Sequence, residues 1–126
     1  MAFAILAVPD LLFQSRFEAA LRARDIDVRV PASAAECTAM LADEPTLVVV
    51  DLQADAFDAP LLIRESSAAG AAVLAFGRHT EAAVLKAARD AGADRAVPRS
   101  QVAEELPMLL DKLLAHPAPG PAADAG

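Results

Sequence analysis

The sequence predicts one α/β domain in which helices cover both faces of a parallel β-sheet. Short apolar segments alternate five times with longer, alanine-rich segments whose apolar residues recur every three or four positions. Two short segments, residues 46–50 and 71–76, lack the polar alternation of a half-exposed strand, which indicates strands buried on both faces. The chain has 126 residues, the length of one ordinary domain. These observations favour a three-layer α/β sandwich.

The composition excludes several classes of protein. Hydrophobic residues make up 56% of the chain and 32 residues are alanine, so the body can bury a core and is not disordered. Trp and Tyr are absent and the formal net charge is −7, which argues against a nucleic-acid partner. One cysteine, Cys37, excludes an internal disulfide and a cysteine metal cluster. Because no apolar run is long enough for a membrane span and residues 2–8 lack the basic flank of a secretory signal, we expect a cytoplasmic protein without membrane contact.

The first three strand–helix units follow from apolar spacing and capping residues. The expected strands of the whole chain are residues 3–8, 26–30, 46–50, 71–76 and, least strongly, 95–97. Phe13, Phe17 and Leu21 place one apolar face on the first helix. Ser33 is expected to cap the second helix, with Glu36 completing a capping box. The third helix, near residues 60–68, has the shortest apolar stripe.

The last two helices are marked by their end residues. Thr80 is expected to cap the fourth helix, and Gly92 to end it in a left-handed conformation. Pro107 fits the first turn of the fifth helix if that helix begins near Ala103, whereas a start at Gln101 predicts a kink. Residues 1–115 therefore form the expected domain. Residues 116–126, with three prolines and no large apolar side chain, are expected to be a disordered tail or the start of a linker.

Chemistry-bearing residues follow three of the expected strands. Ligands of a parallel α/β sheet bind beyond the carboxyl ends of its strands, and Asp10, Asp51 and Arg99 lie at those ends. Two carboxylates can hold Mg²⁺, and a carboxylate beside a metal ion can accept a phosphoryl group. Two alternatives remain open: Asp10 can instead cap the first helix, and Arg99 can form an ion pair with Asp51 or Asp10.

The chain resembles the receiver domains of response regulators over roughly residues 2–115. The resemblance is carried by residues 4–10 (AILAVPD), 47–51 (LVVVD) and 84–94 (VLKAARDAGAD). It implies a flavodoxin-like fold with strand order 2-1-3-4-5, a phosphoacceptor at Asp51, and Mg²⁺ bound weakly, if at all, by Asp10 and Asp51. It also implies that a histidine kinase is a candidate phosphoryl donor in a two-component phosphorelay. A protein partner or a second copy would bind the face made by the fourth helix, fifth strand and fifth helix.

Several positions depart from the receiver pattern. Pro9 replaces the first of two acids, Gly77 the phosphoryl-binding hydroxyl residue, Arg99 the lysine, and Ala96 the switch aromatic. Gly77 and Arg99 thus occupy phosphoryl-contact positions without the usual groups, and Arg99 is free to form an ion pair instead. The departures favour a degenerate receiver, or pseudo-receiver, that is not an enzyme and acts as a protein-interaction module. The alternative is a single-domain response regulator that is phosphorylated at Asp51. A small-molecule carrier is disfavoured, since no glycine-rich phosphate loop follows the first strand.

Overall fold

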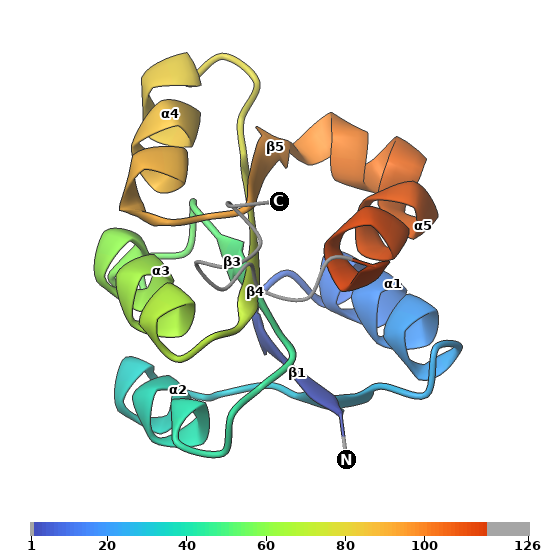
Figure 1. Ribbon diagram of the computed structural model, residues 1–126. Helices are drawn as coiled ribbons and strands as arrows, with labels where there is room; N and C mark the ends of the chain where they lie inside the picture. Colours follow the sequence, from blue (N-terminus) through green and yellow to red (C-terminus); the bar gives the residue numbers. More distant parts are fainter. Residues whose placement is uncertain (1, 116–126) are drawn as a thin grey trace, which may run out of the picture.

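The computed structural model describes residues 2–115, in which five strands alternate with five helices (Figure 1). The strands are β1 (Phe3–Ala7), β2 (Asp27–Arg29), β3 (Leu47–Asp51), β4 (Ala72–Gly77) and β5 (Arg95–Pro98). The helices are α1 (Leu11–Arg22), α2 (Ala34–Leu41), α3 (Ala59–Ala68), α4 (Ala82–Ala91) and α5 (Arg99–Ala115). All pairings are parallel and the order is β2-β1-β3-β4-β5, which confirms the predicted fold. The tail expected at residues 116–126 lies outside the described residues.

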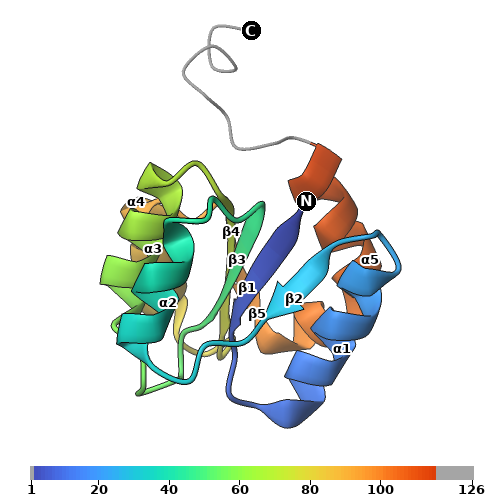
Figure 2. The same cartoon turned by 90° about the horizontal axis from the view of Figure 1, so that it is seen from below.

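The sheet separates two apolar layers. Helices α2, α3 and α4 cover one face, and α1 and α5 cover the other (Figures 1 and 2). Alternate residues of each strand enter opposite layers: Ile5 packs with the α2–α4 layer, and Leu6 with the α1–α5 layer. Every residue of β1, β3 and β4 is buried. Strands covered on both sides favour apolar residues at nearly every position, which explains why these three are apolar except for Asp51 at the end of β3 and Gly77 at the end of β4.

The second helix begins as its sequence predicts. The backbone N–H of Glu36 donates to Ser33 Oγ over 3.1 Å, so the expected cap is confirmed. The Glu36 carboxylate accepts from the backbone of Ala32 at 3.2 Å, one residue before the partner that a standard capping box uses. The bond from Glu36 N satisfies a backbone donor that the first helical turn leaves without a partner, and the bond from Ala32 N satisfies a donor just before the cap.

The expected cap of α4 is wrong, while its expected end is confirmed. The helix begins at Ala82 after Glu81, and no side chain caps it. A turn closed by the bond from Glu81 N to the Arg78 carbonyl, 3.1 Å, carries the chain past Thr80 before the helix starts. Gly92 follows the helix with a φ of 124°, a left-handed value that favours glycine.

Helix α5 begins earlier than either expected start and contains the kink predicted for an early start. Its first residue, Arg99, directly follows β5. Glu105 has non-helical angles of φ −127° and ψ 25°, two residues before Pro107. Pro107 has no N–H to donate to the Ala103 carbonyl, which instead accepts from Arg16 of α1 at 3.3 Å. A side chain of α1 thus binds the carbonyl that the kink leaves free.

No helix within residues 2–115 has the length and apolar character needed to cross a membrane.

Candidate functional site

The carboxyl ends of β1, β3 and β5 bring Asp10, Asp51 and Arg99 together. Asp51 is the last residue of β3, Asp10 lies in the turn before α1, and Arg99 opens α5. Strand β4 lies between β3 and β5 in the sheet. The Arg99 side chain therefore extends across the end of β4 to reach both carboxylates.

The guanidinium of Arg99 is the centre of this site. Its Nη1 donates to Asp51 Oδ1 and to Gln53 Oε1, both at 3.2 Å. Its Nη2 donates to Asp10 Oδ2 at 3.1 Å and to Asp51 Oδ2 at 3.3 Å. The two bonds to Asp51 form the paired fork in which arginine binds carboxylates most specifically. We call Asp10, Asp51, Gln53 and Arg99 the Arg99 cluster.

The three charged groups differ in exposure. The side chain of Asp51 is 5% exposed, that of Arg99 27% and that of Asp10 39%. Asp51 Oδ1 also accepts from the backbone N–H of Gln53 at 3.0 Å. A carboxylate this deeply buried is costly unless it is paired and hydrogen-bonded. Arg99 supplies the positive charge that compensates Asp51.

The two oxygens of Asp10 have separate partners. Oδ1 accepts from the backbone N–H groups of Leu12 and Phe13, at 2.9 and 3.2 Å, so Asp10 caps α1 while Oδ2 binds Arg99. The Phe13 N–H lowers the pKa of Asp10 below its ordinary value; burial opposes this, and Arg99 and the Leu12 N–H lower the pKa further. Partial burial opposes a higher pKa for Arg99, but hydrogen bonds and charges from Asp51 and then Asp10 raise it. Both shifts favour the charged forms.

Aromatic rings lie against the guanidinium. The Arg99 Cζ is 4.6 Å from the centre of the Phe13 ring and 5.1 Å from that of Phe76. Phe76 also packs against Phe13 and Phe17, with ring centres 5.4 and 5.9 Å apart. We call Phe13, Phe17 and Phe76 the Phe stack. Such distances give cation–π attraction, which adds to the four hydrogen bonds.

Sequence reasoning missed two parts of this site. Gln53 carries no charge, and its only signal was its position two residues after Asp51. The Phe stack was predictable in part, because the spacing of Phe13 and Phe17 places both on one face of α1. Phe76 was predicted to lie in a buried strand, and nothing in the sequence indicated that its ring would contact Arg99.

The residues present do not fit Mg²⁺ while Arg99 is in place. The guanidinium nitrogens bind both oxygens of Asp51 and one of Asp10, and the other Asp10 oxygen caps α1. Within residues 2–115, no three His, Cys, Asp or Glu side chains are grouped as a metal site requires. Magnesium needs an octahedral shell of oxygens. Asp10 and Asp51 cannot contribute to such a shell while the Arg99 guanidinium lies between them.

The two remaining positions of interest, Gly77 and Ala96, have no polar side-chain atoms. Gly77 ends β4, and a Cβ added there would lie 3.4 Å from Leu52, an ordinary contact. It borders an open groove of about 350 Å³ that Gln53 and Arg78 also line. Ala96 is buried in β5. Neither residue can therefore supply the hydroxyl or the ring that receiver domains place at these positions.

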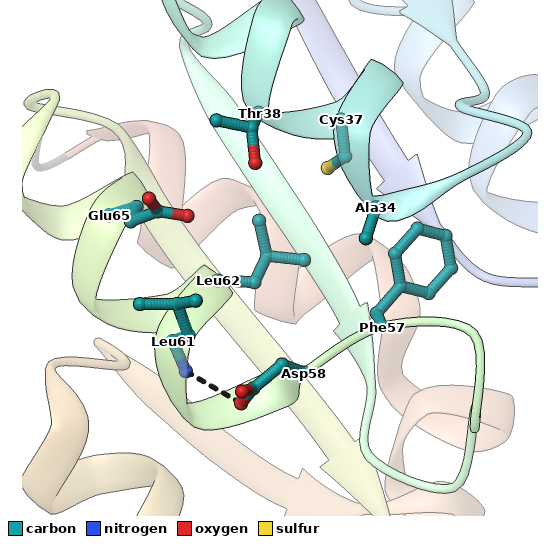
Figure 3. A pocket seen from close by; sticks show the side chains of 8 residues that line it. All are labelled: Ala34, Cys37, Thr38, Phe57, Asp58, Leu61, Leu62 and Glu65. Carbon is teal, nitrogen blue, oxygen red and sulfur yellow. Dashed lines mark hydrogen bonds between the residues drawn. The ribbon is translucent and has the colours of Figure 1, made fainter.

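A second hollow lies between α2 and α3 (Figure 3) and shares no residue with the Arg99 cluster. Its walls include Cys37, Phe57 and Leu62, and its volume is about 40 Å³. That space holds a few water molecules, whereas ligand pockets span roughly 300–1,000 Å³. Burial, and then the charge of Glu65, raise the pKa of the Cys37 thiol to about 11. Cys37 is thus a protected core residue.

The backbone is similar to those of solved response regulators. A two-component response regulator from Clostridium difficile matches with a TM-score of 0.78 and 12% identity, covering 92% of this chain and 98% of that one. The receiver domain of TorR, of the TMAO respiratory system, matches at 0.78 and 16%, covering 91% and 98%. A LuxR-family response regulator from Aurantimonas sp. SI85-9A1 matches at 0.74 and 23%, covering 99% and 94%.

These matches establish the fold. The chain has the receiver-domain fold of response regulators, as the sequence resemblance implied. No protein-family model matches the sequence, and no curated protein matches it significantly. The roles of Asp51, Asp10, Gly77 and Arg99 therefore rest on the geometry described above.

Proposed function

We propose that this chain is a signal-transduction module in which Arg99 takes the place of the divalent cation of a receiver domain. The observation that carries the proposal is the guanidinium bound to both oxygens of Asp51 and one oxygen of Asp10. The module acts by binding other proteins, and it is not an enzyme. In this sense it is a degenerate receiver, or pseudo-receiver.

The geometry disfavours phosphorylation of Asp51. A phosphoacceptor must present a free carboxylate oxygen to the incoming phosphorus, and a metal ion must neutralise the charge that develops. Both oxygens of Asp51 are bound to Arg99, and its side chain is 5% exposed. An incoming phosphoryl group would have to displace Arg99, and Asp10 would then lose its ion-pair partner.

The same reasoning applies to switching. A ligand shifts a conformational equilibrium only through contacts that differ between the two states. Gly77 has no hydroxyl to bind a phosphoryl oxygen, and Ala96 has no ring to change position in response. The proposal therefore predicts that α4 and α5 keep one conformation whether or not Asp51 is modified.

We assign partner binding to the face made by α4, β5 and α5. Strand β5 is at the edge of the sheet, with α4 and α5 on either side (Figure 1). Val84 on α4 and Met108 on α5 are large apolar residues that remain 39% and 38% exposed. Arg95 of β5 is exposed as well. Exposed apolar side chains and arginine are both enriched at protein interfaces, so this face suits a protein partner or a second copy of the chain.

The test compares the wild type with Asp51→Asn. Amide chemical shifts over residues 77–110 are recorded with Mg²⁺ before and after adding beryllofluoride or acetyl phosphate, and phosphate incorporation is measured. We expect no coherent shifts, no incorporation, and no loss of affinity for a captured partner in Asp51→Asn. Arg99→Lys, which restores the residue type of receiver domains, is the control. Phosphate on wild-type Asp51, or partner binding lost in Asp51→Asn, would instead support a phosphorylatable response regulator served by a histidine kinase.

A further inference from the structure

The acceptors around Arg99 match a planar cation. Four hydrogen bonds join its two terminal nitrogens to Asp10, Asp51 and Gln53, and all four lengths lie between 3.1 and 3.3 Å. A guanidinium presents its N–H groups at the edge of a plane, so its faces remain free for apolar contact. The acceptors of Asp10, Asp51 and Gln53 therefore occupy the edge of the cation and leave its faces to other groups.

Two rings of the Phe stack supply those other groups. Phe13 and Phe76 approach the guanidinium carbon within 4.6 and 5.1 Å. The chain has five phenylalanines, and three of them form this stack. A ring face attracts a weakly hydrated organic cation, but it offers no oxygen to a metal ion. Mg²⁺ also releases its water reluctantly and demands octahedral geometry.

From these contacts we propose that the acceptors of the Arg99 cluster, together with Phe13 and Phe76, form a cation site selective for guanidinium over Mg²⁺, in which Phe13 is a positioning residue. The inference rests on the proposed function, because it explains why the carboxylates hold an arginine in place of a metal ion. It also goes further. The selectivity belongs to the groups that surround Arg99, so the space vacated by its side chain binds a free guanidinium ion better than it binds Mg²⁺.

The experiment uses the full chain with Arg99→Ala. Guanidinium chloride is titrated up to roughly 50 mM, far below the molar concentrations that unfold proteins, against sodium chloride at equal ionic strength. Binding is followed by amide shifts of residues 10–13 and 51–53 and by the melting temperature, and MgCl₂ is titrated in parallel. Phe13→Leu is then added to Arg99→Ala, since leucine keeps apolar bulk and removes the ring face.

We expect guanidinium to bind Arg99→Ala more tightly than Mg²⁺ does. Adding Phe13→Leu should weaken guanidinium about fivefold, the factor for a cation–π contact of about 1 kcal/mol, and leave Mg²⁺ affinity unchanged. Phe17→Leu is the matched control, because Phe17 packs against Phe76 and is not one of the two rings that approach the guanidinium. It should not alter the preference. Tighter binding of Mg²⁺, or guanidinium affinity indifferent to Phe13→Leu, overturns the inference.

A second measurement keeps the test valid if Arg99→Ala does not fold. In the otherwise wild-type chain, NMR measures the rotation rate of the Arg99 guanidinium about its Cζ–Nε bond. Phe13→Leu should accelerate this rotation, whereas Arg29, whose Cζ lies 3.9 Å from the Phe3 ring, should be unaffected. An unchanged rate for Arg99 overturns the positioning role. Mg²⁺ binding or phosphorylation in the wild type would contradict the proposed function, whereas Mg²⁺ preference in Arg99→Ala would contradict this inference alone.

Discussion

Replacing Arg99 by alanine should destabilise the protein far more than removing an exposed arginine. The substitution removes every guanidinium bond to Asp51, whose side chain is 5% exposed. Asp51 would keep the Gln53 N–H as its hydrogen-bond donor. An ionised carboxylate would then be buried without a compensating charge, which is among the most destabilising changes a single substitution can make.

The size of the effect follows from the exposure of the two partners. Breaking a fully buried ion pair costs about 3–5 kcal/mol. Because the Arg99 side chain is 27% exposed, water can enter the vacated space and solvate Asp51 in part. We therefore expect a loss of about 2–3 kcal/mol in the free energy of unfolding, or roughly 8–12 °C in melting temperature for a domain of this size.

Urea unfolding at neutral pH gives the free energy, and Arg29→Ala serves as the matched control. Arg29 also stacks on a phenylalanine and pairs with a carboxylate, Asp43, at 2.9 Å, but the side chains of Arg29 and Asp43 are 41% and 62% exposed. Its loss should cost about 1 kcal/mol or less. A second substitution, Asp51→Asn, should recover about 1–2 kcal/mol in Arg99→Ala, because it removes the uncompensated charge. If Arg99→Ala costs no more than Arg29→Ala, the reasoning about Asp51 is refuted.

Three further predictions test other groups. The pKa of Asp10 is lowered from 3.8, so its ionised form stabilises the fold above that pH, and the stabilisation is lost as the pH falls through the lowered value. Melting temperatures between about pH 6 and pH 2 should show this loss, and Asp10→Asn should flatten it. Gly77→Thr should cost under about 1 kcal/mol in urea unfolding, because its Cβ meets Leu52 at 3.4 Å, and a larger cost would contradict the space described. Cys37, with a pKa of about 11, should react with iodoacetamide roughly a hundredfold more slowly in the native protein than in urea, and equal rates would refute its burial.

The fold was predictable because its determinants are local and repeated. Apolar runs such as residues 47–50 can be read without knowing their neighbours, and five of them alternating with helices leave few topologies. Capping at Ser33 and termination at Gly92 likewise depend on residues within one turn. The resemblance to receiver domains then selected the strand order from those few.

The start of α5 was not predictable, since no local signal marks it. The residue directly before Arg99 is Pro98, which ends β5, and not a Ser, Thr, Asp or Asn that could cap the helix. Contacts with Asp10 and Asp51 hold its side chain, and those residues are distant in the sequence. At Thr80 a local signal was present but misleading. Threonine is a common cap, yet the turn that ends at Glu81 places the start of α4 after it.

The Phe76 contact with Arg99 was hidden for a similar reason. It depends on how far the Arg99 side chain extends from the start of α5 across the end of β4, and this distance is fixed by the assembled sheet. The sequence identified the three charged residues of the site and the possibility of an ion pair between them. It did not identify the groups that hold the cation in place.

The Arg99 cluster joins residues that are 89 and 48 positions apart along the chain, and this separation bears on the rate at which the fold is lost. Because Asp10, Asp51 and Arg99 stand at the ends of three separate strands, we expect their contacts to form after these strands have assembled and the folding barrier has been crossed. Interactions absent from the transition state slow unfolding without accelerating folding. Arg99→Ala should then leave the refolding rate nearly unchanged and raise the unfolding rate about thirtyfold, the factor for a loss of about 2 kcal/mol. In stopped-flow measurements only the unfolding limb of the chevron plot should change. Arg99 would then set the lifetime of the folded state.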